Sequence, residues 1–254
     1  TLTPDGSHYL VKGRKVWTTK APYCQKVLLL VRTSPRSEGA RPTDGMTLLL
    51  ADLQDPTGTV RPEVEIVPIA KAGRNAVVSC EVAYDDLPVA VEDRVGDEGE
   101  GFRYLLDGLN PERILIAAEA LGTGRAALRR AVAYAKERIV FDRPIGQNQG
   151  IAFPLARAHM ELRAAELAIR EAAWRYDQGL PCGEAANTAK YLAAEAGYAA
   201  ADQAVQTLGG MGYASEYHVE RYWREARLMR LAPVSQELVQ AYVATQVLGL
   251  PRSY

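Results

Sequence analysis

The apolar residues in positions 1–90 fall into short runs, and turns that contain Gly or Pro separate one run from the next. Runs of this length, rich in Val, Leu and Ile, are typical of antiparallel strands. We expect residues 8–19 to form two strands joined at Lys12-Gly13-Arg14. Further strands are expected in the stretches KVLLLVRTS, MTLLLADL, VEIVPIA and AVVSCEVAYDDLPV. The expected fold of this region is a small antiparallel barrel or sandwich.

From Gly101 onward the apolar positions recur every three or four residues, which is the period of an α-helix. One long helix is expected to bury a stripe made of Leu155, Ala158, Leu162, Ala165, Ile169, Ala172 and Tyr176. Other helices are expected near 121–132, over 185–206 and over 219–229. Because alanine-rich faces let helices pack closely, the pattern predicts an antiparallel bundle of four or more helices.

The two patterns together predict an α+β chain, in which an antiparallel β barrel or sandwich is followed by an antiparallel α-helical bundle. The β domain would cover residues 1–97 and the bundle residues 98–254, and residues 86–101 would form the linker. A chain of 254 residues is long enough to bury a core in each of two such domains.

The composition is that of a soluble globular protein, with 48% hydrophobic residues, 24% charged residues and a net charge of −1. This balance gives no indication of a nucleic-acid or membrane partner. No apolar run reaches the length that a membrane-spanning helix needs, and the first residues lack the apolar core of a signal peptide.

The residues that most often bind metals or form disulfides are few: Cys24, Cys80, Cys182, His8, His159 and His218. The cysteines are odd in number and far apart, which favours free thiols in a reducing compartment, and we expect a cytoplasmic location. The histidines have no metal-ligand neighbour at a suitable spacing, so no metal site is expected.

Several local strings together span nearly the whole chain: GRKVWTT, VAYDDLPV…VEDRVGDEGEGF, LNPERILIAAEALG, YAKERIVFDRPIGQNQ, VQTLGGMGYASEYHVERYWREAR and VSQELVQAYVATQVLG. In this order they resemble the acyl-CoA dehydrogenase family. The resemblance implies a middle β domain followed by a C-terminal helical bundle, which agrees with the periodicity. The family's N-terminal helical domain has no counterpart in these residues. We therefore expect the C-terminal portion of a longer enzyme, or a truncated form that is inactive alone.

The resemblance also implies the chemistry. In the family, a carboxylate removes a proton from the α carbon of an acyl-CoA thioester while FAD accepts a hydride from the β carbon. The electrons leave through an electron-transfer flavoprotein. Because the family shares FAD between subunits, a homodimer or homotetramer is implied. The sequence does not indicate the length or branching of the acyl chain.

Three segments match the family's flavin contacts. In the first, Trp17 would flank the isoalloxazine ring, and Thr18 and Thr19 would hydrogen-bond to its polar edge. Taken without the resemblance, Trp17 reads more simply as a core aromatic of its strand. In the second segment, the matching residues are Arg138, Phe141, Asn148 and Gln149.

Arg138 matches the residue that pairs with the FAD phosphates, for which a guanidinium fork is well suited. Its alternative role is that of a solvated cation at a helix end. The family usually has Gly after the Phe, whereas this chain has Asp142.

The third segment contains Gln206, Gly209 and Gly210, which match positions that approach the adenosine and diphosphate from another subunit in the family. Glycine lets backbone N–H groups come close to a ligand, although a glycine pair between helices also reads as an ordinary turn. Ser235 and Glu237 match further positions near the cofactor, and Glu237 replaces the usual amide.

The base usual in the family is absent, because Pro233 falls on the Glu position and Val234 on the following Gly position. A minority of the family carries its base in a Leu-x-x-Glu-Arg segment, which LNPER matches. Glu112 is therefore the expected base, and Asn110, Arg113 and Val234 are expected to contact the substrate. The alternative is that Asn110-Pro111 starts a helix and Glu112 stabilises it.

Glu237, one helical turn after Pro233, is a weaker candidate for the base. A third carboxylate, Glu119, lies two turns beyond Glu112 and is expected to be structural or to line the substrate site. Two other functions also stay open. One is a flavin-dependent monooxygenase on the same fold, which needs no such base. The other is a non-catalytic subunit or fragment that completes a partner's flavin site through Arg138 and the QTLGG segment.

Overall fold

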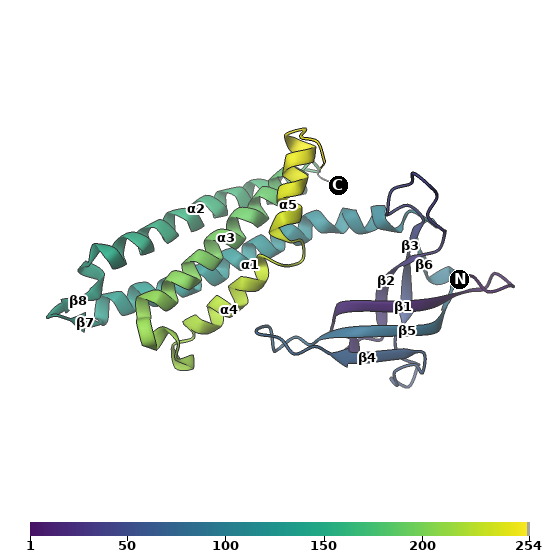
Figure 1. Cartoon of the computed structure of the whole chain (residues 1–254), viewed down its shortest axis with the longest axis horizontal. Coiled ribbons are helices and arrows are strands. Elements are labelled where there is room, and N and C mark those ends of the chain that lie inside the picture. Colours follow the sequence, from purple (N-terminus) through teal and green to yellow (C-terminus); the bar gives the residue numbers. More distant parts are fainter. Residues whose placement is uncertain (253–254) are drawn as a thin grey trace. The chain divides into compact units, whose positions relative to one another are not determined.

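The computed structural model describes residues 1–252 and divides into two compact units. A β-rich unit covers Thr1–Gly108, and a helical unit begins at Leu109 (Figure 1). The division falls inside the first long helix, α1 (Gly101–Glu137), whereas the boundary expected from the sequence lies ahead of that helix. We describe each unit by itself.

The β-rich unit contains two three-stranded antiparallel sheets, with the strand orders β1-β5-β4 and β2-β3-β6. The strands are β1 (His8–Thr19), β2 (Lys26–Arg32), β3 (Met46–Asp52), β4 (Val64–Pro68), β5 (Ser79–Ala90) and β6 (Arg94–Val95). Each expected apolar run therefore forms a strand, and the prediction of an antiparallel β region is confirmed.

Two details of the expected strand pattern are wrong. Residues 8–19 form one strand rather than a hairpin, because irregularities in the pairing of β1 with β5 absorb the glycine and the charged residues. One lies at Gly13, with φ 143°, and the other contains Trp17, with φ 68°. The expected linker at 86–101 is also partly sheet, since β5 continues to Ala90 and β6 follows.

The core of the β-rich unit is formed by side chains at alternate positions of the strands, which point to the same face of the sheet. Along β5, Cys80, Val82 and Tyr84 are buried, and burial resumes one residue out of phase at Leu87 and Val89. The intervening Asp86 has φ 56°, so a local kink restores the inward direction of the following side chains.

The described residues of the helical unit form a bundle of five α-helices. Figure 1 shows their arrangement. After α1 come α2 (Gln149–Asp177), α3 (Gly183–Leu208), α4 (Val219–Met229) and α5 (Gln236–Tyr242). A short hairpin of β7 (Ile139–Val140) and β8 (Arg143–Pro144) joins α1 to α2. The predicted bundle of four or more helices is confirmed. The predicted stripe of α2 is buried from Leu155 to Ala172, whereas its last member, Tyr176, is exposed.

Small residues set the spacing between α1 and α3. A Cβ added at Gly197 would lie 2.5 Å from the carbonyl oxygen of Ala120, and one added at Gly124 would lie 2.8 Å from the Cα of Gly197. The backbones therefore touch at this crossing, and only glycine fits there without moving a helix.

The start of α1 corrects another expectation. The helix begins at Gly101, so Asn110 and Pro111 lie in its interior and do not form a helix start. Gly101 packs against the backbone of Thr47 and Leu48, and the carbonyl of Glu100 accepts the N–H groups of Arg103 and Tyr104. These contacts begin the helix well ahead of the proline, which then costs one internal hydrogen bond.

A buried carboxylate joins α1 and α2. Glu166 accepts hydrogen bonds from Arg125 on α1, from Arg163 at 2.6 Å and from Arg170 at 2.8 Å. The side chain of Glu166 is only 11% exposed, whereas all three arginines reach solvent. Hydrogen bonds from Arg170, Arg163 and Arg125 lower the pKa of Glu166 from 4.5 to about 2.

A second polar cluster holds the start of α5 against α3. The buried Lys190 donates from Nζ to Oε1 of Gln236 at 3.0 Å. Nε2 of Gln236 donates to Oε1 of Glu195 at 2.8 Å, and Nε of Arg230 donates to the same oxygen at 2.7 Å. Burial lowers the pKa of Lys190 from 10.5 to about 8. The cluster ties both sides of the loop between α4 and α5 to one face of α3.

Replacing Glu166 by Gln should lower the melting temperature at pH 7, because three guanidinium groups lose their charged acceptor. The folded-state pKa lies below the ordinary value, so the stabilisation is full above about pH 4.5 and is lost as the pH falls through about 2. Thermal unfolding of both proteins should show the difference shrinking across that window. Glu161→Gln, an exposed change on the same helix, should leave the melting temperature unchanged. A pH-independent difference would contradict the charge argument.

Replacing Lys190 by Met should remove a pH dependence of stability. The folded-state pKa of about 8 lies below the ordinary 10.5, so the unfolded chain binds more protons between these values and wild-type stability rises with pH there. The rise expected from Lys190 is of order 2–3 kcal/mol. Urea unfolding at pH 7.5 to 10.5 should show it in wild type and in the exposed control Lys136→Met, but not in Lys190→Met. If the free energy of unfolding changed with pH in the same way in all three proteins, Lys190 would not be the source of the pH dependence.

Candidate functional site

The β-rich unit holds one group of expected flavin residues at the end of β1. Trp17 lies within the irregular pairing of β1, with φ 68°, and its side chain is 62% exposed. It is not a core aromatic, so that alternative is wrong. Thr18 and Thr19 follow directly, paired with Cys80 and Ser79 of β5. A bulky residue in the left-handed region costs about 1–2 kcal/mol, and the neighbouring strand pairing holds Trp17 in this conformation.

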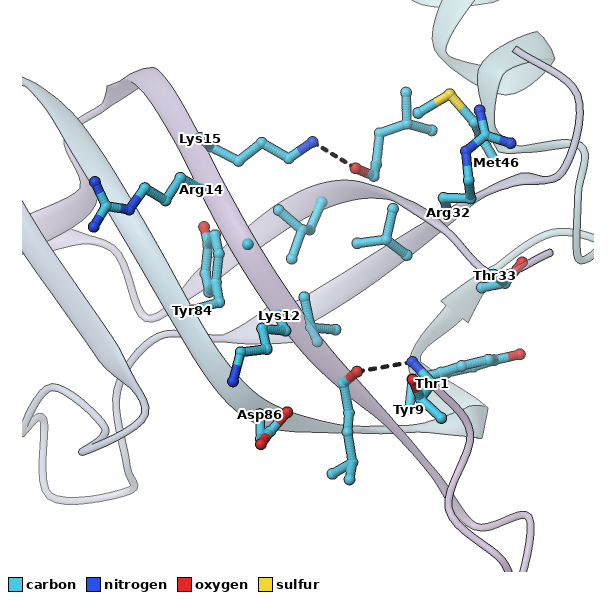
Figure 2. Close-up of a pocket in the computed structure, with 16 residues that line it drawn as sticks. Thr1, Tyr9, Lys12, Arg14, Lys15, Arg32, Thr33, Met46, Tyr84 and Asp86 are labelled. Carbon is cyan, nitrogen blue, oxygen red and sulfur yellow. Dashed lines mark hydrogen bonds between the residues drawn. The ribbon is translucent and has the colours of Figure 1, made fainter. Parts of the chain in front are cut away.

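A cavity of about 480 Å³ lies between β1 and β2 in the same unit (Figure 2). Residues 9–15 and 29–33 form most of its lining, and Nζ of Lys15 crosses to the carbonyl oxygen of Leu30 at 2.7 Å. None of the sequence-predicted site residues lines this cavity. It lies along the edges of two strands and brings together no base, nucleophile or metal-ligand set, so we place no chemistry there.

The β7–β8 hairpin presents a second group. Phe141 and Asp142 form its turn, with φ 53° and 61°, so Asp142 has a positive φ at the position where the resemblance implies glycine. Asn148 is held by Arg143 at 2.8 Å and by its own bond to the carbonyl of Ile145 at 3.1 Å. The Phe141 side chain is 92% exposed. Arg138 and Gln149 are exposed as well.

The C-terminal end of α3 carries the third group. Gly209 ends the helix with φ 59° and ψ −133°, a conformation open to glycine alone, while Gln206 and Gly210 are exposed. The rings of Tyr134 and Tyr217 meet edge to face at 5.9 Å, which joins the end of α1 to the turn after α3. The hairpin and glycine groups therefore lie at the same end of the bundle (Figure 1).

Gly209 and Gly210 differ in whether the backbone conformation of the turn requires glycine at their position. Gly209 needs its backbone conformation, whereas Gly210 has no positive φ, and a Cβ added there would meet nothing within 4 Å among the described residues. The nearby Gly212 is different again, since it packs against the carbonyl of Val205. The described chain therefore gives no internal reason for glycine at position 210.

The other end of the bundle carries the expected catalytic group on α1. Nη1 of Arg113 donates to Oδ1 of Asn110 at 3.0 Å. Arg113 is half-buried, burial lowers its pKa, and its Nε has no hydrogen-bond partner within residues 1–252. Glu112, the expected base, is exposed on the same turn. The described residues therefore do not bury this carboxylate.

Arg113 on that turn of α1 and Glu237 at the start of α5 are both close enough to Lys190 for their charges to affect its pKa. The two segments therefore lie near the same buried lysine. Ser235 caps α5, and its Oγ accepts the N–H of Leu238 at 3.3 Å. Hydrogen bonds from the backbone at the helix start and from Ser235 lower the pKa of Glu237. A carboxylate whose ionised form is stabilised is a weaker base, which argues against Glu237. Val234 is partly exposed just before the cap.

Sequence reasoning missed Lys190 and Gln236, the residues that fix this loop. The signal was present for Lys190, since it falls on the buried face of α3 with Ala186, Ala189 and Ala193. A lysine on an otherwise apolar helix face needs a buried partner. The identity of that partner, Gln236 on another helix, could not be read from spacing.

Within residues 1–252, no helix is long and apolar enough to cross a membrane, and no group of three or more His, Cys, Asp or Glu side chains could hold a metal ion. Cys24, Cys80 and Cys182 are free thiols.

Known proteins agree with this architecture. A family model described as acyl-CoA dehydrogenase, C-terminal domain, matches residues 99–247. Acyl-CoA dehydrogenase FadE12 of Mycobacterium tuberculosis is 43% identical in a match that covers all of this chain and 64% of the relative. Butyryl-CoA dehydrogenase from Megasphaera elsdenii superposes with a TM-score of 0.88 at 29% identity, over 97% of this chain and 62% of that one.

A complex of glutaryl-coenzyme A dehydrogenase with glutaryl-CoA is similar too, with a TM-score of 0.88, 28% identity, and coverage of 98% of this chain and 61% of that one. The chain thus spans less than two thirds of the length of these relatives. By the family model, the sequence identity and the shared fold, the chain belongs to the acyl-CoA dehydrogenase family.

Proposed function

We propose that this chain is part of an FAD-dependent enzyme that dehydrogenates an acyl-CoA thioester between its α and β carbons, with Glu112 as the base. The observation that carries this proposal is the position of Glu112 inside α1, since the helix starts at Gly101. Because both residues lie in the helix interior, helix capping by Asn110 or Glu112 does not explain why a glutamate stands at position 112. Arg113 on this turn and Glu237 at the start of α5 both lie within electrostatic range of Lys190, and α5 follows the position at which the resemblance implies the usual base and this chain has Pro233.

In this proposal Glu112 accepts the α-proton, and Arg113 is held beside it by Asn110. The N–H group at Nε of Arg113 is buried and has no hydrogen-bond partner among the described residues, so it is a donor that no protein group uses. Glu112 is exposed in the described chain, so the substrate and further protein must cover it to raise its affinity for a proton. Bound FAD would supply the hydride acceptor.

The residues at the far end of the bundle fit a flavin dinucleotide. Arg138 is exposed and forms no ion pair or hydrogen bond through its side chain within the described residues, so its guanidinium is available to a diphosphate. Gly210 is open on the same end, where a backbone without a side chain allows a close approach. The exposed ring of Phe141 provides apolar contact area there, and in the β-rich unit the exposed ring of Trp17 is a separate candidate contact.

The two groups on the bundle are too far apart for one flavin in one copy. Arg113 lies inside α1, which runs from Gly101 to Glu137, and Arg138 directly follows the C-terminal end of that helix. At the rise of an α-helix the two residues are about 38 Å apart along the helix axis. This separation exceeds the length of the extended dinucleotide. It supports a homodimer or homotetramer in which one copy provides Arg138 and Gly210 to the flavin of another. An electron-transfer flavoprotein is the proposed electron acceptor.

Replacing Glu112 by Gln should slow flavin reduction by acyl-CoA by about 10²–10⁴-fold, because no carboxylate accepts the α-proton. The measurement is an anaerobic titration of the flavin-loaded protein, expressed from its complete reading frame, with a panel of acyl-CoAs. Flavin bleaching should be lost in Glu112→Gln while the flavin stays bound. Glu161→Gln, an exposed carboxylate on α2, is the matched control.

Bleaching that persists unchanged in Glu112→Gln would refute its role as the base. If no acyl-CoA bleaches wild type, the dehydrogenase proposal itself fails. Hydroxylated product with rapid reoxidation by oxygen would then support the flavin monooxygenase.

Replacing Arg138 by Met should weaken FAD binding by about 10–100-fold, since a charge-assisted contact to phosphate contributes about 1.5–3 kcal/mol. Flavin fluorescence on dilution measures the affinity, and circular dichroism checks the fold. Arg129→Met, also exposed on α1, should leave the affinity unchanged. Equal flavin affinity in wild type and Arg138→Met would rule out the diphosphate contact.

A further inference from the structure

Two buried side-chain atoms of the helical unit have no hydrogen-bond partner within residues 1–252: Nε of Arg113 on α1 and Oδ1 of Asn187 on α3. The first atom carries a donor N–H group, and the second is an acceptor. A polar atom that is buried without a partner is unfavourable, so each one in a folded protein needs an explanation. Asn187 is only 1% exposed, which keeps its acceptor away from the surface solvent.

The orientation of the Asn187 amide is set by its own helix. Its Nδ2 donates to the carbonyl oxygen of Gly183, one turn earlier, at 2.8 Å. Because a carbonyl oxygen can only accept, this bond requires the amide nitrogen, and Oδ1 points away from it. Turning the amide over would set Oδ1 against another oxygen. The free acceptor of Asn187 is therefore a consequence of the fold.

Gly183 leaves space for a hydroxyl group that comes from α5. A Cβ added at Gly183 would lie 2.5 Å from the hydroxyl oxygen of Tyr242 and 3.4 Å from the ring carbon that carries it. Gly183 has no positive φ, so its backbone conformation does not require glycine. The contact with Tyr242 accounts for the missing side chain, and it places the Tyr242 hydroxyl beside the first turn of α3.

Tyr242 also lies near Arg113. Burial lowers the pKa of Arg113, and the ionisable groups of Tyr242 and Glu112 act in the opposite direction, with Tyr242 having the larger effect of the two. Arg113 in turn affects Lys190, which follows Asn187 by three positions on the buried face of α3. The side chains of Arg113, Asn187 and Tyr242 therefore converge from three helices.

We propose that Arg113, Asn187 and Tyr242 bind one water molecule where α1, α3 and α5 meet. The water accepts the N–H of Arg113 Nε, and it donates one hydrogen to Oδ1 of Asn187 and the other to the hydroxyl oxygen of Tyr242. Arg113 and Asn187 do not reach each other directly, since both atoms are without a partner.

The three groups suit a water molecule. A buried water typically makes about three hydrogen bonds to polar groups that lack other partners. One donor and two acceptors match the two lone pairs and two hydrogens of water better than they match a cation or an anion. The water would connect the helix that carries Arg113 to both α3 and α5. Its binding does not rest on the proposed enzymatic activity.

The first test is a crystal structure of the protein, expressed from its complete reading frame, at a resolution that shows ordered water. We expect one spherical density peak within hydrogen-bond distance of Arg113 Nε, Asn187 Oδ1 and Tyr242 Oη. The peak should be lost in Tyr242→Phe. A direct bond between Arg113 and Asn187, the absence of the peak, or a peak that is unchanged in Tyr242→Phe would overturn the proposal.

Unfolding in urea gives a second test. Tyr242→Phe and Asn187→Leu should each raise the equilibrium constant of unfolding by about 5–30-fold, since each removes an acceptor of the water. The double variant should show much less than the product of the two effects, because either change already releases the water. Tyr176→Phe, at an exposed tyrosine of α2, should leave the constant unchanged. Two effects that simply multiply would contradict a shared water.

Gly183→Ala tests the placement of the Tyr242 hydroxyl. In wild type the added methyl group should displace that hydroxyl and raise the unfolding constant by a factor similar to that of Tyr242→Phe. In the Tyr242→Phe background the methyl group meets the ring carbon at 3.4 Å, an ordinary contact, so alanine should be tolerated. Equal destabilisation in both backgrounds would show that the hydroxyl lies elsewhere and would exclude the site.

Discussion

The close crossing of α1 and α3 determines the geometry of the helical unit. Ala120 and Gly124 on α1 meet Gly197 on α3 with no room for an added methyl group. Because the backbones touch, α1 and α3 cannot shift relative to each other without steric overlap. The residues at the ends of the two helices are therefore held at fixed distances from one another. The glycine turn after α3 and the hairpin after α1 are thereby placed together at one end. The Arg113 turn and the start of α5 lie at the other.

Among the described residues of this unit, the buried charged side chains, Glu166 and Lys190, each lock one helix to another. Glu166 is held among three arginines between α1 and α2. Lys190 reaches Gln236 and so connects α3 to α5. An isolated charge in an alanine-rich core would be strongly unfavourable, so the amine and the carboxylate are stable there only with their partners in place. The loop that contains Val234 is therefore positioned by groups that are not themselves expected to touch the substrate.

Several of the candidate site residues share one property in the described chain, which is that their side chains are exposed. Trp17, Phe141 and Arg138 are all exposed, and so is Glu112. An apolar ring or a catalytic carboxylate gains its function from being covered, by a cofactor, by another copy or by further polypeptide. This agrees with a chain that spans less than two thirds of its relatives' length.

The sequence alone determined the class of the protein. Alternation over 1–90 and the helical period after Gly101 depend on local burial, so they predicted the strands and helices, and the motif order predicted the family. What needed tertiary structure were the features set by contacts between distant residues. Asn110-Pro111 has the chemistry of a helix start, but packing of Gly101 on Thr47 and Leu48 begins the helix earlier. Lys190 and Gln236 are separated by 46 positions, and the exposure of Glu112 depends on which elements cover it. Local patterns record which face of an element is apolar, whereas only the folded chain decides which residues meet across it.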